Sequence, residues 1–76
     1  MEYEVNALEI GKKLRELRGY KPRRVVSQET GITERALTTY EKGERIPRDE
    51  VKIILSNYYK VPIQKLFFCK STTQNE

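Results

Sequence analysis

The sequence predicts a small all-α domain made of about five short helices. Apolar residues recur three and four positions apart along most of the chain, a spacing that places them on one face of a helix. Single glycines and prolines interrupt these runs and divide the chain into short segments. No strand alternation, internal repeat or low-complexity tract is visible. The 76 residues leave room for one domain with a modest core.

The first two helices are separated by Gly19 and Pro22. The apolar stripe of the first helix consists of Ala7, Ile10, Leu14 and Leu17. Gly19 breaks that helix, and Pro22 suits the first turn of the next one because its missing N–H has no helical partner there. The second helix runs through about Thr30. Its valines have poor helix propensity, so packing must hold it.

Residues 31–47 encode a tight turn, a capped helix and a second sharp exit. Gly31 is suited to the positive φ that ends a helix, Ile32 is an apolar plug, and the Thr33 hydroxyl caps the third helix. Gly43 stops this helix, and Pro47 prevents its continuation.

The third helix has one apolar and one polar side. Leu37 and Tyr40 share a side with Glu41. The other side carries Arg35, Thr38, Thr39 and Lys42. Small hydroxyls and long donors suit contact with base edges in a DNA groove, and an ordinary surface helix is the alternative.

Two further helices follow Pro47. Asp49 is the expected N-cap of a fourth helix that reaches Tyr59, and its inward residues are Val51, Ile54, Leu55 and Tyr58. A break at Val61-Pro62 precedes a short fifth helix with Ile63, Leu66 and Phe67. We expect residues 1–6 to be a flexible N-terminus, 7–68 the folded domain and 69–76 a polar tail.

Basic charge is concentrated around the turn. The whole chain has 15 Lys and Arg against 11 Asp and Glu, a formal net charge of +4 and a pI near 9.3. Between residues 11 and 48 there are eleven basic and five acidic residues, so this segment alone carries 11 − 5 = +6. A polyanionic partner is favoured.

Several function classes are excluded by composition. The chain has no His, and its single cysteine, Cys69, offers no partner for a metal or nucleophilic site. One cysteine also fits a reducing cytoplasm. No glycine-rich phosphate loop or membrane-length apolar run is present. We therefore expect no enzyme activity, cofactor, metal, membrane contact or small-molecule ligand.

Spaced motifs over nearly the whole chain resemble the Cro/CI and Xre-type helix-turn-helix family, with a lambda-repressor-like fold. They read I-G-K-K-L-R-E-L-R-G at 10–19, G-I-T at 31–33, Y-E-K-G at 40–43, R-I-P at 45–47 and V-P-I-Q-K-L-F at 61–67. The resemblance implies binding to double-stranded DNA.

The resemblance also implies roles for individual residues. Base edges are assigned to Glu34, Arg35, Thr38 and Thr39. Phosphate contacts are assigned to Arg23, Arg24, Lys21, Lys42 and Arg45. The family usually has Gln where this chain has Arg23. As alternatives, Glu34 only complements the helix N-terminus, and each cation is simply solvated.

In the family pattern, Arg18 and Glu41 form an interior ion pair that holds the recognition helix, the alternative being two solvated charges. The aromatic residues Tyr58, Tyr59, Phe67 and Phe68 are candidates for a homodimer patch, or else belong to the core or to scattered surface.

The expected function is a small transcriptional regulator, a repressor from a phage, a mobile element or a bacterial chromosome. Within the DNA-binding class, a controller protein of a restriction-modification system is the alternative to such a repressor. A helix-turn-helix scaffold that binds another protein, of antirepressor or antitoxin type, is the alternative from another class.

Overall fold

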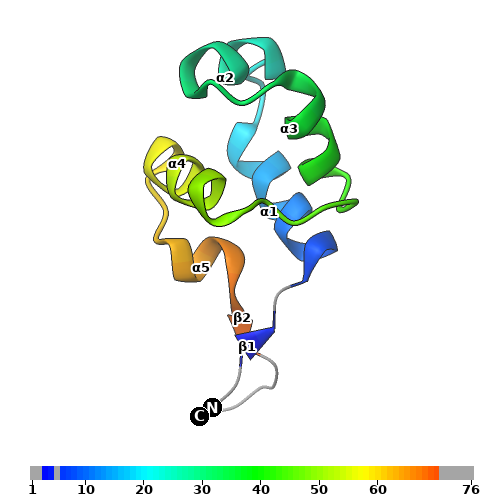
Figure 1. Ribbon diagram of the computed structural model, residues 1–76, viewed down its shortest axis with the longest axis vertical. Helices are drawn as coiled ribbons and strands as arrows, with labels where there is room; N and C mark the ends of the chain where they lie inside the picture. Colours follow the sequence, from blue (N-terminus) through cyan, green and yellow to red (C-terminus); the bar gives the residue numbers. More distant parts are fainter. Residues whose placement is uncertain (1–2, 5, 71–76) are drawn as a thin grey trace.

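Glycine or proline residues lie in each connection between successive helices, near the places that the sequence predicts. Figure 1 shows how the helices are arranged. The computed structural model describes residues 3–4 and 6–70, with the side chains of residues 6–68. Its helices are α1 (Ala7–Arg18), α2 (Arg23–Thr30), α3 (Glu34–Glu41), α4 (Asp49–Tyr59) and α5 (Ile63–Phe67). The predicted all-helical fold class is confirmed.

Side chains cap two of the helices. The Asn6 carboxamide oxygen accepts from the backbone N–H of Glu9 at 3.1 Å, and the Thr33 hydroxyl accepts from the N–H of Ala36 at the same distance. Each bond satisfies an N–H that has no partner inside its helix. Thr33 is therefore the N-cap of α3, as the sequence predicts.

The predicted N-cap of α4 is wrong by one residue. Arg48, not Asp49, occupies this position, with extended backbone angles and no side-chain cap. Its carbonyl accepts from the N–H of Lys52 at 2.9 Å, so the first helical hydrogen bond forms one residue earlier than an Asp49 cap requires. Asp49 lies instead in the first turn, where the positive end of the helix dipole stabilises its carboxylate.

The core gathers one face from every helix. Its buried apolar residues are Ile10, Leu14, Val26, Ile32, Leu37, Tyr40, Leu55, Leu66 and Phe67. The expected inward face of α4 is only partly correct, because Ile54 is 38% exposed while Lys52 is only 9% exposed. The Lys52 ammonium lies 5.0 Å from the centroid of the Phe68 ring and 3.7 Å from the Asp49 carboxylate. Leu17, at the end of the α1 stripe, is also 38% exposed.

Gly11 allows α1 to cross closely over the end of α3. A Cβ at this position would lie 2.5 Å from the Glu41 carbonyl oxygen and 2.6 Å from that of Tyr40. Since these contacts are with backbone atoms, no side-chain movement relieves them. A residue without a Cβ is therefore needed here for α1 to pack this closely against the end of α3.

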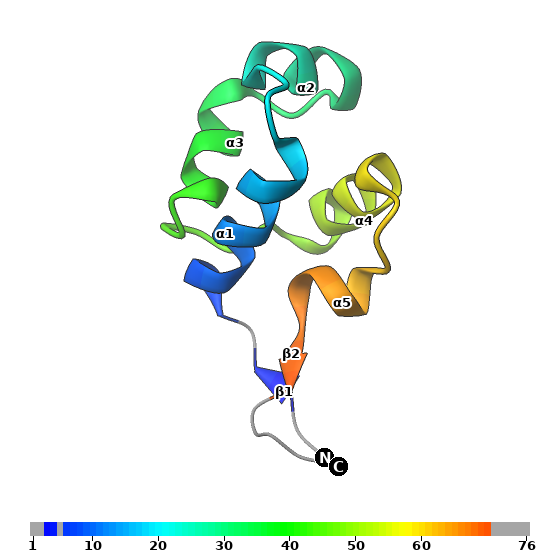
Figure 2. The ribbon, with the colours of Figure 1, turned by 180° about the vertical axis from the view of Figure 1, so that it is seen from behind.

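A two-stranded ribbon joins the ends of the described chain. Strand β1 (Tyr3–Glu4) pairs antiparallel with β2 (Cys69–Lys70), Tyr3 opposite Lys70 and Glu4 opposite Cys69. Figures 1 and 2 both place it beyond α1 and α5. Strands of two residues have no alternation to detect, so the sequence did not predict them. Residues 1–2, 5 and 71–76 lie outside the described residues, and the predicted flexibility of both ends stays a prediction.

Candidate nucleic-acid interface

The turn between α2 and α3 is held by both backbone and side-chain bonds. Gly31 takes the left-handed conformation at φ 82°, and its N–H donates to the Ser27 carbonyl at 2.8 Å. The Thr30 hydroxyl donates to the Val26 carbonyl at 2.7 Å and accepts from the N–H of Ile32 at 3.2 Å. Ile32 is buried. The hydroxyl at position 30 thus supplies hydrogen bonds that an apolar side chain lacks, and the turn holds α3 at a set angle to α2.

The outward face of α3 carries the four residues assigned to base contacts. Glu34 and Arg35 are exposed, and Thr38 and Thr39 are half-buried. Each threonine hydroxyl donates to the carbonyl four residues earlier, Thr38 to Glu34 and Thr39 to Arg35, both at 2.9 Å. The hydroxyl protons are used within the helix, so these side chains offer an oxygen acceptor and a methyl group to a ligand.

A hollow of about 220 Å³ lies between α3 and the loop that follows it. Its lining residues are Thr33, Arg35, Ala36, Thr39, Tyr40 and Arg45. The hollow brings Arg45, assigned to a phosphate, beside Arg35 and Thr39, assigned to bases. The loop and the helix thus form one surface on which cationic and hydroxyl groups converge.

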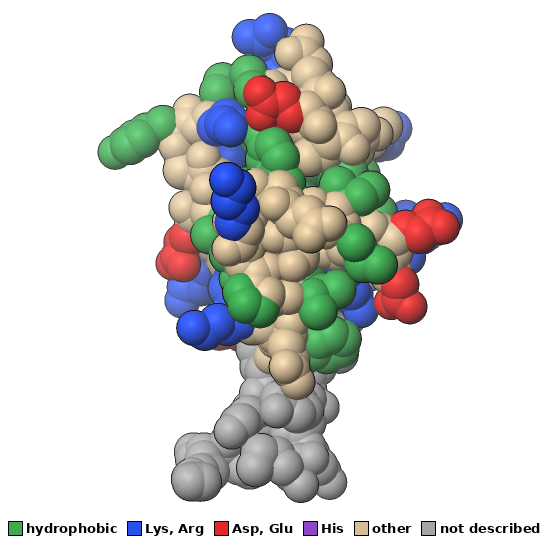
Figure 3. All heavy atoms as spheres, turned by 90° about the vertical axis from the view of Figure 1, so that its left-hand side faces the viewer, with side chains coloured by type: hydrophobic (Ala, Val, Ile, Leu, Met, Phe, Trp, Pro, Cys, Tyr) green, Lys and Arg blue, Asp and Glu red, His purple; other side chains and the backbone are tan. Residues whose placement is uncertain are grey.

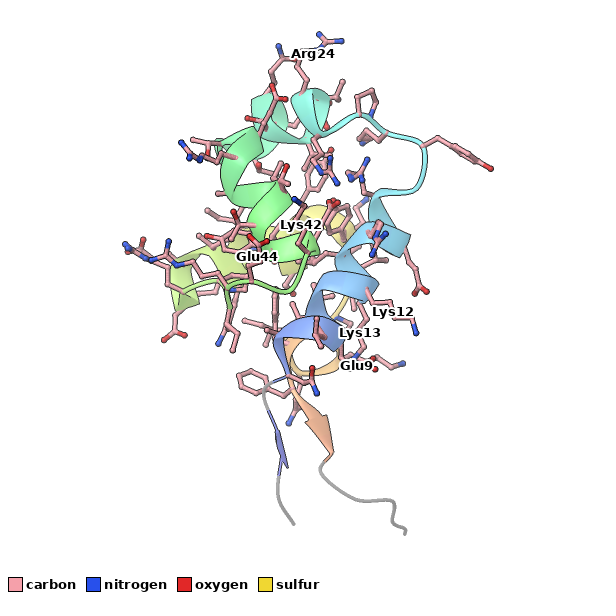
Figure 4. All side chains as sticks on the ribbon, turned by 90° about the vertical axis from the view of Figure 1, so that its right-hand side faces the viewer. Glu9, Lys12, Lys13, Arg24, Lys42 and Glu44 are labelled. Atoms are coloured by element: carbon pink, nitrogen blue, oxygen red, sulfur yellow. The ribbon has the colours of Figure 1, made fainter. Side chains whose placement is uncertain are left out.

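Exposed cations lie beside the start of α2 and the end of α3. Arg24 is in the first turn of α2 and Lys42 follows the end of α3 (Figure 4). The first turn of α2 has no acidic residue, and its N-cap, Pro22, makes no side-chain hydrogen bond. This helix start therefore presents uncapped N–H groups beside two arginines, which favours an anion there.

Glu41 binds two arginines below the surface. Its side chain is 3% exposed and accepts from Arg18 at both oxygens, Nε to Oε2 at 2.8 Å and Nη2 to Oε1 at 2.9 Å. Arg23 adds Nε and Nη2, each 3.1 Å from Oε1. The hydrogen bond to Glu41 raises the pKa of Arg18 above its ordinary value, against the opposing effect of burial. Arg23 is therefore held by a carboxylate, not free on the rim.

Lys21 lies in a different cluster, away from the outward face of α3. Its ammonium donates to the Tyr58 hydroxyl at 2.8 Å and lies 3.5 Å from the Glu29 carboxylate. The Tyr58 hydroxyl also donates to Glu29. The hydrogen bond with Tyr58 is the main reason that the pKa of Lys21 is raised and the pKa of Glu29 is lowered. The structure thus places this cation between α2 and α4.

The four aromatic residues do not form one exposed patch. Phe67 is completely buried, so its predicted place on a dimer surface is wrong: the end of α5 inserts this ring into the core. Tyr58 and Tyr59 meet edge to face at 5.0 Å between centroids, and Phe68 packs under Lys52. Burial raises the pKa of Tyr59 to about 12, with the Glu41 charge as a smaller cause.

Sequence reasoning missed several exposed residues near the interface. Ile46, Ile53 and Ile54 are exposed, and hydrophobic side chains are visible on the face that carries α4 (Figure 3). Arg48 lies with Arg45 on a hollow of about 440 Å³ between the α2–α3 turn and α4. The repeated arginine on either side of Ile46-Pro47 was the available signal for Arg48.

No helix of the described residues is long and apolar enough to cross a membrane. Among those same residues, no group of three His, Cys, Asp or Glu side chains is placed to hold a metal ion.

A bundle in which a capped turn presents α3 to the outside defines a helix-turn-helix protein. The chain belongs to the helix-turn-helix family HTH_3, whose model matches residues 12–66. Within this family it is of the Cro/CI or Xre type, as its motifs indicate.

Two solved structures are similar over most of the chain. The crystal structure of the DNA-binding domain of BldD is 26% identical with a TM-score of 0.68, over 82% of this chain and 93% of that one. The DNA-binding domain of S. venezulae BldD is 26% identical with a TM-score of 0.69, over 82% of this chain and 96% of that one. No curated protein matches the chain.

Proposed function

We propose that this protein is a sequence-specific regulator of transcription that binds double-stranded DNA with α3 in the major groove. The observation that carries the proposal is the exposed face of α3, with Arg35 beside Arg45 on one hollow and a hydrogen-bonded, capped turn before the helix. The similarity to DNA-binding domains of BldD supports it. Repression by occupation of the DNA site, in the cytoplasm, is the mode we propose.

Residues at the start of α3 are proposed to contact the base edges. Arg35 is fully outside the core, so it is able to donate two hydrogen bonds to a guanine, worth about 1–3 kcal/mol of discrimination. Glu34 accepts from a cytosine amino group, or only complements the helix N-terminus. Thr38 and Thr39 meet bases through oxygen and methyl groups, since their protons are engaged within α3.

Phosphate contacts fall to the rim of the unit. Arg24 follows Arg23 at the start of α2, Lys42 follows Glu41 at the end of α3, and both are exposed; Arg45 lies in the loop between α3 and α4. Arg23 contributes its charge while it is bound to Glu41, and Lys21 is the weakest member of this set because Tyr58 and Glu29 engage it. Contacts of this kind fix the register of the protein on the duplex without reading its sequence.

We propose that two copies bind one operator. A single α3 spans few base pairs, and a two-fold dimer places two such helices about 34 Å apart on one face of the duplex. Of the aromatic candidates, Tyr58, Tyr59 and Phe68 remain partly exposed. A restriction-modification controller is the variant of this proposal, and the genes beside this one distinguish it from a phage or mobile-element repressor.

A protein-binding scaffold of antirepressor or antitoxin type is the second candidate. The observation in its favour is that the exposed Ile46 and Ile54 line the larger hollow, while Ile53 is exposed elsewhere on α4. Such a module binds its partner without a steep dependence on salt, whereas DNA binding weakens steeply as salt rises.

The test is selection of bound duplexes from random DNA at moderate salt. We expect an enriched, two-fold symmetric site. Arg35→Ala is expected to lose preference at one or two base pairs, about 1–3 kcal/mol, while it retains non-specific binding. No enrichment above bulk DNA, together with no loss of affinity at higher salt, would rule out the regulator.

A further inference from the structure

Three helix ends meet at the carboxylate of Glu41. Arg18 is the last residue of α1, Arg23 the first of α2, and Glu41 the last of α3. Oε2 accepts from Arg18, and Oε1 accepts from both arginines. Arg18 also donates from Nη1 to the Lys21 carbonyl at 3.0 Å, which ties the chain between α1 and α2 to the same point.

The two arginines are not equivalent. Arg18 has the two-pronged contact, which uses both carboxylate oxygens, and its side chain is 14% exposed. Arg23 reaches only Oε1, and its side chain is 35% exposed. One carboxylate neutralises one guanidinium, so the cluster keeps a net charge of one positive unit. That surplus lies on Arg23, the more exposed partner.

The contact of Arg23 with Glu41 joins the ends of α2 and α3 that lie away from the turn. The end of α2 and the start of α3 are already linked through Gly31, whose N–H bonds to Ser27. The start of α2 and the end of α3 are not joined by a short segment of chain. Arg23 and Glu41 connect them with Nε and Nη2 each 3.1 Å from one oxygen. The angle between the two helices is thereby held at both ends.

We infer that Arg23 is a positioning residue that sets the angle of α3 through Glu41, and so contributes to base selectivity as well as to charge. The inference rests on the proposed function and deepens it. A guanidinium that only met phosphate would affect all sequences equally. A brace on α3 affects the selected site most, because base contacts depend on the placement of that helix.

Arg23→Lys tests the inference because it keeps the charge and removes the two-donor geometry. Affinity is measured for the selected site and for random duplex over a range of salt concentrations. We expect the ratio of specific to non-specific affinity to fall about fivefold or more. The slope of log affinity against log salt stays at its wild-type value, since the charge is retained.

Lys42→Ala is the matched control. Lys42 follows α3, is exposed, and makes no ion pair with the described residues. We expect it to weaken both duplexes alike and to reduce the salt slope by about 0.9. A thermal melt of each variant checks that both are folded at the assay temperature.

A second measurement works without DNA. In Arg23→Lys, the backbone amide resonances of α3 are expected to shift, while those of α5 stay in place. A wild-type selectivity ratio in this variant, or unmoved α3 amides, overturns the inference. If the wild-type protein shows no salt-dependent DNA binding, the proposed function fails, and the amide shifts still decide whether Arg23 holds α3.

Discussion

Two clusters built from similar groups connect α2 to its neighbours. In the Glu41 cluster a carboxylate binds Arg18 and Arg23, and in the Glu29 cluster a carboxylate binds Lys21 and Tyr58. Each ties α2 to another helix. They differ in burial: the Glu41 side chain is 3% exposed and that of Glu29 is 51% exposed.

That difference decides what each cluster contributes. The groups around Glu41 have lost most of their water, so removing one partner leaves a buried charge without compensation. Water solvates Glu29 and Lys21 with or without each other, and salt screens their attraction. Similar polar contacts therefore stabilise the fold strongly around Glu41 and only weakly around Glu29.

Removal of the buried carboxylate is the strongest test of this contrast. Glu41→Ala leaves both arginines unpaired at the junction of three helices. We expect a loss of about 3–5 kcal/mol in the free energy of unfolding, measured by urea denaturation. A loss as small as that of a surface substitution would show that water compensates the arginines in place of Glu41.

The tyrosine beside the buried cluster gives a pH-dependent test. Burial raises the pKa of Tyr59 from its ordinary 10.0 to about 12. Between these values the unfolded chain releases the proton while the folded chain keeps it, so this group's stabilisation is complete below pH 10 and declines as pH rises toward 12.

We expect Tyr59→Phe to show a shallower alkaline decline than the wild-type protein in urea midpoints measured across that interval. Tyr20→Phe, at a fully exposed tyrosine, is the matched control and should follow the wild-type curve. Parallel curves for wild type and Tyr59→Phe would contradict the assigned burial.

The smallest effect is expected at the exposed cluster. Glu29→Gln removes a carboxylate whose pKa is lowered mainly by the Tyr58 hydroxyl, so its contribution is present at neutral pH and is lost as the pH falls through the folded pKa. Because the group is exposed, we expect a slight decrease in melting temperature at neutral pH that disappears in high salt. A large decrease in melting temperature, or one that persists in high salt, would show that Glu29 contributes to stability as a buried carboxylate such as Glu41 does.

The helix boundaries were largely predictable, because Gly19 and Gly31 readily take the positive φ that ends a helix and Pro47 cannot continue one. The choice of which α4 residues face the core was less predictable. Val51, Ile54 and Leu55 form an apparent stripe, yet Ile54 is 38% exposed and Lys52 is turned inward over Phe68. Which of two neighbouring apolar residues is buried depends on the helices packed against them, and periodicity alone does not contain that information.

The candidate site shows the same division. Arg35 and Thr39 could be placed on the outward face of α3 from the helical repeat alone. The pairing of Arg18 with Glu41 was implied by family resemblance. The attachment of Arg23 to the same carboxylate was not, since it requires knowing that the start of α2 and the end of α3 meet.

By itself the sequence determined the helices, the capped turn at residues 31–33 and the concentration of positive charge around it, because these depend on backbone restrictions and composition within a few residues. Only the tertiary structure decided which charges are shared. Arg23 and Lys21 look alike as rim cations in the sequence, yet Glu41 holds one and Tyr58 and Glu29 hold the other. Electrostatic partners depend on distances between helices and on the exclusion of water, and both arise only when the helices pack.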